Sequence, residues 1–150
     1  MIRDDIKAAQ ITAMKAGDKE TRNAVSLIQA AVKNRDIEAR TGKAPEDDDS
    51  LVIEVLQKMV KQRRESIEMY VKGGRQELAD AEAAEVTVIE RFLPKQLSAE
   101  ETAAAVEAIK AELGASGMKD MGRVMAELKA RHGTELDMSK ASAAVKAALS

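Results

Sequence analysis

The sequence predicts an all-helical protein, and its composition supplies the first reasons. Aromatic residues make up only 1% of the 150 residues, so Ala, Leu, Ile, Val and the 8 Met must fill the core. Strands favour aromatic and β-branched side chains, whereas this alphabet is rich in good helix formers. The chain is 45% hydrophobic and 33% charged, which is too apolar for a disordered protein. Apolar spacings of three and four residues point the same way.

Two helices are expected before residue 41. The first ends at Gly17, and Asp18 is placed to cap the second, because its carboxylate can accept from a free backbone amide. The second helix should run to about residues 38–40. The apolar positions that predict these helices are Ile2, Ile6, Ala9, Ala13, Val25, Ile28 and Val32.

Two more helices follow a loop at residues 41–50, which contains Gly42, Pro45 and an acidic run at residues 46–49. The negative end of this loop favours the start of the third helix. Gly73 and Gly74 end that helix, and the fourth stops before Pro94. Short links favour an up-and-down four-helix bundle, although two hairpins meeting obliquely also fit. The apolar positions are Val52, Val55, Leu56, Met59, Val60, Ile67, Tyr70, Val71, Leu78, Ala81, Val88, Ile89 and Phe92.

A smaller three-helix part is expected after Pro94. Ser98 and Glu101 form a capping box that opens the fifth helix, which closes at Gly114. Asp120 is expected to cap a sixth helix that ends at Gly133, and a seventh starts at about Ser139. We therefore predict an N-terminal helical domain at residues 1–94 and a C-terminal one at residues 95–150. The apolar positions are Val106, Ile109, Leu113, Val124, Met125, Leu128, Val145, Ala148 and Leu149.

The bulk composition favours a cytoplasmic protein with no membrane partner. The 0 cysteines leave no disulfide or thiolate metal site and are compatible with a reducing compartment. Residues 1–20 contain no continuous apolar stretch, so no secretory signal is expected, and no later run reaches membrane-spanning length. The formal net charge of -2 lacks the strong basic excess typical of nucleic-acid binding, so no DNA partner is expected. Local charge distribution matters more than the sum.

No catalytic residue, cofactor or metal site is predicted. His132 is the single histidine, and its place before Gly133 suits a helix end or the surface. The acidic run at residues 46–49 lacks the ligand spacing and turn glycine of a calcium loop. Arg63 falls on the apolar seam of the third helix, where we expect an ion pair with Glu82 or Glu85 rather than a ligand role.

Local basic clusters are the candidate binding groups. Proteins that read single-stranded RNA stack its bases on aromatic side chains, and this chain has almost none. Any RNA that it binds should therefore be folded and contacted through its backbone. Such contacts fix position without reading sequence. The competing interpretation is a solvated mixed-charge surface. A further cluster comprises Lys33, Arg35, Arg40 and Lys43. The nucleic-acid candidates are Lys119, Arg123, Lys129 and Arg131, with Lys58, Lys61 and Arg64 as a second patch.

Four blocks of the sequence resemble the GatB/YqeY family, and specifically its stand-alone YqeY-like members. They keep their order over essentially the whole chain. Phe92 stands before Leu-Pro where the family usually has Tyr, which is a mild departure. The blocks are "LIQAAVKNRDIEAR" (27–40), "KQRRESIEMYVKGGRQELADAE" (61–82), "FLPKQLSAEE" (92–101) and "MKDMGRVMAEL" (118–128).

The resemblance implies a four-helix part followed by a three-helix part, and kinship with the tail of the B subunit of the tRNA-dependent amidotransferase. In that enzyme the tail contacts tRNA, while transamidation takes place in a separate domain. Carbon–nitrogen ligase activity with glutamine as amido donor would therefore belong to a larger assembly. The implied function is a non-catalytic accessory module whose partner is tRNA or a tRNA-processing enzyme.

An alternative function is a helical adaptor that binds proteins and has no RNA role. The low net charge and the short Met-containing helices fit it equally well, because Met adapts to varied partner surfaces.

Overall fold

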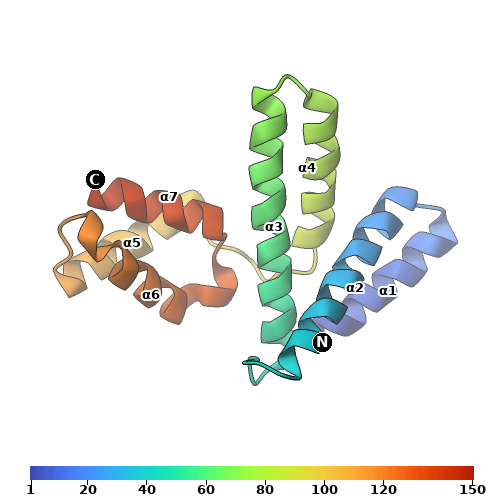
Figure 1. The fold of residues 1–150 in the computed structure, drawn as a ribbon, viewed down its shortest axis with the longest axis horizontal. Helices are drawn as coiled ribbons and strands as arrows, with labels where there is room; N and C mark the ends of the chain where they lie inside the picture. Colours follow the sequence, from blue (N-terminus) through green and yellow to red (C-terminus); the bar gives the residue numbers. More distant parts are fainter. The chain divides into compact units, whose positions relative to one another are not determined.

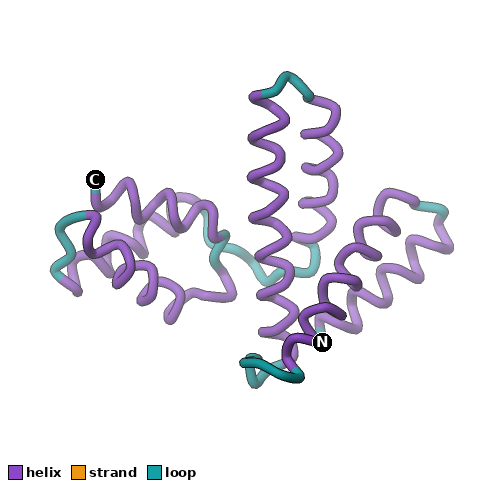
Figure 2. Tube along the Cα trace, viewed as in Figure 1, coloured by secondary structure: helices purple, strands orange, loops and turns teal.

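The computed structural model describes the backbone of residues 1–150 and every side chain except those of residues 138 and 139. The described backbone is helical and contains no strand, which confirms the predicted all-helical class (Figures 1 and 2). The seventh helix begins at Met138, one residue before the expected start at about Ser139. The elements are α1 (Ile2–Ala16), α2 (Lys19–Ala39), α3 (Asp48–Lys72), α4 (Gln76–Glu90), α5 (Ala99–Leu113), η1 (Met118–Asp120), α6 (Met121–His132), η2 (Gly133–Glu135) and α7 (Met138–Leu149).

The helices gather into two compact units, Met1–Leu93 (unit 1) and Pro94–Ser150 (unit 2). Each unit has its own cluster of buried apolar side chains. Phe92 and Leu93 pack against the core of unit 1, whereas Leu97 packs against the core of unit 2. That residues 1–94 and 95–150 are separate domains, each able to fold by itself, stays a prediction. In the part of the chain that the structure describes, no helix is both long and apolar enough to cross a membrane.

Unit 1 consists of two helical hairpins that meet obliquely. Helix α1 lies beside α2, α3 lies beside α4, and α2 packs against both helices of the second hairpin (Figure 1). An up-and-down four-helix bundle would place α1 beside α4, but among the described residues these two helices make no contact. The second arrangement that the loops allowed is therefore the observed one, and the up-and-down bundle is not.

The end of the α3–α4 hairpin explains the difference. Helix α3 buries its apolar side chains between Leu51 and Val60, where a third helix covers it. Val71 and Leu78, which were expected in the core, are 51% and 41% exposed. Within unit 1, α1 and α2 do not reach this end of the hairpin (Figure 1). Apolar periodicity marked the correct helix, but its last turn stays exposed in the part of the chain that the structure describes.

Most predicted helix ends are confirmed. The Asp18 carboxylate accepts from the backbone N–H of Thr21 at 3.1 Å. Ser98 and Glu101 exchange two hydrogen bonds of 3.1 Å, which completes the capping box of α5. Gly17 ends α1 with φ 69°, a left-handed conformation that glycine adopts without steric cost.

Asp120 and Gly133 flank α6 at the predicted positions, but neither residue caps the helix in the expected way. The Asp120 carboxylate accepts from no backbone N–H in the first turn of α6; it accepts from the backbone N–H of Ser116 at 3.0 Å and pairs with the side chain of Arg123 at 2.9 Å. Asp120, the last residue of η1, therefore closes the loop that precedes α6 instead of capping the first turn of that helix. At the other end Gly133 has φ −47° and continues into η2 rather than turning the chain.

The acidic run at residues 46–49 organises the start of α3, as its position predicted. Asp47 accepts from the backbone N–H of Ser50 at 3.2 Å. Asp48 binds Arg3 at 2.8 Å, and the same guanidinium donates to both carboxylate oxygens of Asp36 at 2.9 and 3.0 Å. One arginine thus ties α1 to α2 and α3.

Arg3→Met should destabilise unit 1 at neutral pH and weaken its response to acid. Hydrogen bonds from Arg3 hold the pKa of Asp36 below its usual range. A carboxyl with a lowered folded-state pKa stabilises the fold above its unfolded pKa of about 4, and that stability is lost as pH falls through the folded value. We expect the melting temperature of Arg3→Met to lie below that of the wild type at neutral pH and to converge with it in acid.

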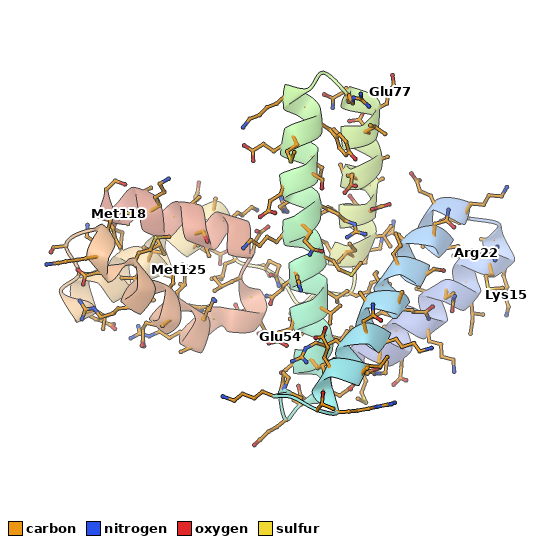
Figure 3. All side chains as sticks on the ribbon, viewed as in Figure 1. Lys15, Arg22, Glu54, Glu77, Met118 and Met125 are labelled. Carbon is orange, nitrogen blue, oxygen red and sulfur yellow. The ribbon has the colours of Figure 1, made fainter. Side chains whose placement is uncertain are left out.

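Thermal unfolding followed by circular dichroism across this pH range measures the difference. Arg22→Met is the matched control, because Arg22 is exposed on the same hairpin and forms no ion pair among the described residues (Figure 3). A deficit of Arg3→Met that stays constant into acid would contradict the role assigned to Asp36.

Candidate nucleic-acid interface

A shallow groove between α2 and α3 brings two of the predicted basic clusters together. Lys58 comes from the cluster on α3, and Arg35 comes from the cluster at the end of α2. The groove has a volume of about 230 Å³. Its lining residues are Ala31, Asn34, Arg35, Glu38, Val55, Lys58, Met59 and Gln62.

Helical spacing places polar side chains at the rim of this groove. Val55 and Met59 are buried and form part of the core of unit 1. Lys58 and Gln62 follow them by three residues each, so they emerge beside the same face of α3. Asn34 lies three residues after the half-buried Ala31 on α2, by the same rule. The rim therefore offers an ammonium group and two side-chain amides.

The cations around the groove differ in their partners. Lys58 and Lys61 are exposed, and neither meets a carboxylate within 4 Å among the side chains that the structure describes. Arg35 reaches Glu54 of α3 at 3.6 Å and donates to the backbone carbonyl of Lys43 at 3.0 Å; Figure 3 labels Glu54. The two lysines are thus available for an outside anion, whereas Arg35 is already engaged.

The other arginines of α3 hold the α3–α4 hairpin together. Arg63 donates to Glu85 at 2.8 Å, which confirms the predicted intramolecular pair. Arg64, a predicted nucleic-acid contact, pairs with Glu90 at 2.9 Å. A phosphate would have to displace that carboxylate to bind Arg64.

In unit 2, the two arginines of the predicted patch are also paired. Arg131 binds Glu127 one turn earlier on α6 at 2.8 Å and bonds to Glu112 of α5. These hydrogen bonds raise the pKa of Arg131 further and lower the pKa of Glu112. Arg123 pairs with Asp120 at 2.9 Å. Both guanidinium groups are therefore committed within unit 2.

Lys119 and Lys129 are the members of this patch that stay available. Both are exposed, and neither meets a carboxylate within 4 Å in the described part of the chain. Lys119 lies in η1 and Lys129 in the last turn of α6. His132 lies half-buried at the end of that helix. None of the described His, Asp or Glu side chains form a group of three that could hold a metal ion.

The structure therefore ranks the seven predicted contacts without testing nucleic-acid binding, which stays a prediction. Among the described side chains, Lys58, Lys61, Lys119 and Lys129 meet no carboxylate within 4 Å, and the three arginines are paired. Sequence reasoning missed Asn34 and Gln62, because neutral amides carry no charge signal. The available signal was their position in the sequence, since Gln62 follows Lys58 by one helical turn and Asn34 stands next to Arg35.

A comparison with protein-family models matches the Yqey-like protein family over residues 3–149. The chain belongs to this family. The resemblance carried by its four sequence blocks is thereby confirmed. The match covers both units of this Yqey-like protein, so the family relationship is not limited to one of them.

Two relatives carry the name "Altered inheritance of mitochondria protein 41, mitochondrial". The one from Eremothecium gossypii is 31% identical over 130 residues, which cover 85% of this chain and 67% of the relative. The one from Kluyveromyces lactis is 30% identical over 91 residues, which cover 61% of this chain and 45% of the relative. The chain thus spans about two thirds of the first relative and less than half of the second. Those names place the relatives in mitochondria, and the cytoplasmic location expected for this chain stays a prediction.

Proposed function

We propose that this Yqey-like protein is a non-catalytic module that binds folded tRNA in association with a tRNA-dependent amidotransferase or another enzyme of aminoacyl-tRNA metabolism. The observation that carries the proposal is the α2–α3 groove, where Lys58, which meets no carboxylate within 4 Å among the described side chains, lies beside Arg35 and two side-chain amides. The resemblance to the amidotransferase tail supports tRNA as the class of RNA. Carbon–nitrogen ligase activity with glutamine as donor would belong to the larger assembly.

The groove suits contacts to an RNA backbone. Lys58 and Lys61 can each neutralise a phosphate as a point charge. Asn34 and Gln62 carry both donors and acceptors, which match the 2′-hydroxyl that distinguishes RNA from DNA. Such contacts would recognise the shape of a folded RNA and would not read its bases. This chemistry agrees with a chain that has almost no aromatic platforms.

Lys119 and Lys129 form the second set of proposed contacts. The arginines rank below the lysines, since Arg64, Arg123 and Arg131 would have to exchange a carboxylate for a phosphate. Their proposed role is to hold the helices that carry the lysines in place.

Lys58→Met/Lys61→Met should weaken tRNA binding about tenfold at low salt and reduce the steepness of its salt dependence. Each lost phosphate contact releases one counterion fewer, so the slope of log affinity against log salt should fall by about one per lysine. Fluorescence anisotropy with labelled tRNA over a salt series measures both quantities.

The matched control is Lys15→Met/Lys19→Met, which makes the same charge change at the exposed α1–α2 turn (Figure 3 labels Lys15). It should retain most of the affinity, and Lys119→Met/Lys129→Met should show an intermediate loss. Equal losses in all three double variants would show that binding follows net charge alone and would overturn the assignment to the groove.

A further inference from the structure

The face of α2 that points towards α1 lies away from the α2–α3 groove. Along it, side chains of α1 and α2 pair across the first hairpin at successive levels, which we call rungs. At one end Arg3 donates to both carboxylate oxygens of Asp36, at 2.9 and 3.0 Å. About two turns further along, the amide nitrogen of Gln29 donates to the side-chain oxygen of Gln10 at 3.0 Å. Both rungs join α1 to α2 through matched partners.

The rung between them holds two lysines. Lys7 lies one turn from the outer rungs on α1, and Lys33 lies one turn from them on α2, so both reach the same level of the hairpin. Both line one groove. Neither meets a carboxylate within 4 Å among the described side chains; Asp36, which also lines the groove, accepts from Arg3 through both of its oxygens. Asp4, at the same end of the groove, lies 4.0 Å from the N-terminal amine.

Two like charges that share a groove repel one another, and the repulsion falls when an anion lies between them. The groove has room for one, with a volume of about 410 Å³, which is within the range of small-molecule sites. Ile6 and Val32, both buried in α1 and α2, supply an apolar floor. Gln10 keeps its own amide N–H groups as donors, because its bond to Gln29 uses only its oxygen.

We propose that the α1–α2 groove binds a phosphomonoester of nucleotide size. A phosphate carrying close to two negative charges matches the paired ammonium groups of Lys7 and Lys33, and Gln10 adds a neutral donor. The apolar or planar part of the ligand lies on Ile6 and Val32. This site is separate from the proposed tRNA contact, because Asn34 and Arg35 face a different groove from Lys33 and Asp36. It therefore does not depend on the proposed function.

Titration of the full chain with adenosine 5′-monophosphate at low salt tests the proposal. Nuclear magnetic resonance should show shifts concentrated at residues 3–10 and 29–36, with weaker binding of inorganic phosphate and none of adenosine. Lys7→Met/Lys33→Met should weaken binding by about tenfold or more, since both charges are lost. Lys15→Met/Lys19→Met, on the same hairpin, and Lys58→Met/Lys61→Met, on α3, should bind the nucleotide like the wild type.

The ligand-free variant supplies a second readout. Without ligand, Lys7→Met/Lys33→Met should melt at a higher temperature than the wild type at low salt, because the repulsion within the groove is removed. A variant that binds the nucleotide as tightly as the wild type would overturn the proposal. So would a wild type that binds none, or that binds adenosine equally well. Loss of tRNA binding in Lys58→Met/Lys61→Met with nucleotide binding intact would separate the two sites.

The phosphomonoester could be a free mononucleotide or the terminal phosphate of an RNA. A short RNA with a 5′-phosphate and the same RNA with a 5′-hydroxyl distinguish these sources. Tighter binding of the phosphorylated RNA, lost in Lys7→Met/Lys33→Met, assigns the groove to RNA ends. Equal binding of the two RNAs, with the mononucleotide still bound through the lysines, assigns it to free nucleotides.

Discussion

Leu128→Ala should unfold unit 2 and leave unit 1 folded. Leu128 is fully buried at the centre of the unit 2 core, in the same cluster as Val106, Ile109 and Val124. Truncating a buried leucine costs about 2–5 kcal/mol, depending on how far the cavity collapses. A core as small as that of unit 2 rarely supplies more than about 3–5 kcal/mol of net stability. One substitution can therefore consume most of it.

Hydrogen exchange on the full chain measures this result segment by segment. Amides of α5, α6 and α7 should lose protection, while those of α2 and α3 keep theirs. Met125→Ala is the matched control on the same helix, because its half-buried side chain leaves a smaller cavity (Figure 3). Protection that collapses together in both units would show that the chain folds as one cooperative domain, contrary to the predicted division at residues 94 and 95.

Glu85→Ala should destabilise unit 1 by about 2 kcal/mol, because it leaves a charge stranded. Its partner Arg63 is only 15% exposed and lies on the apolar seam of α3. Without the carboxylate, the guanidinium keeps a long hydrogen bond of 3.4 Å to the carbonyl of Met59. Replacing both charges, in Arg63→Met/Glu85→Leu, should recover much of the loss, since apolar side chains of similar size suit this position.

Urea unfolding of the three proteins gives the comparison, and Glu90→Ala provides the control. The Arg64–Glu90 pair has a similar length of 2.9 Å but is more exposed, so its loss should cost less than about 1 kcal/mol. If Glu85→Ala and Glu90→Ala proved equally destabilising, the burial of Arg63 would have no special role.

Local chemistry explains why the helices were predictable. A cap such as Asp18 or Ser98 accepts a hydrogen bond from a backbone amide only three residues away. A glycine such as Gly17 ends its helix through its own left-handed backbone conformation. The crossing of the two hairpins was not predictable in this way. Periodicity shows which face of a helix is apolar, but Val71 and Leu78 show that it does not supply the neighbour that covers the face.

For the candidate site, the sequence shows which residues are charged but not which of them form ion pairs with one another. The basic clusters stand in the sequence, but the partner of Arg131 on α5 and the partner of Arg64 on α4 become visible only when the helices pack. The level shared by Lys7 and Lys33 likewise depends on the register of α1 against α2, which no local signal specifies.

The affinity of the full chain for tRNA, compared with an RNA duplex of equal length over a salt series, is the measurement that decides the proposed function. We expect tighter binding of tRNA than of the duplex, with an affinity that falls steeply as salt rises, because phosphate contacts release counterions. Binding to tRNA that is no tighter than binding to the duplex, even at low salt, would contradict a tRNA-binding role.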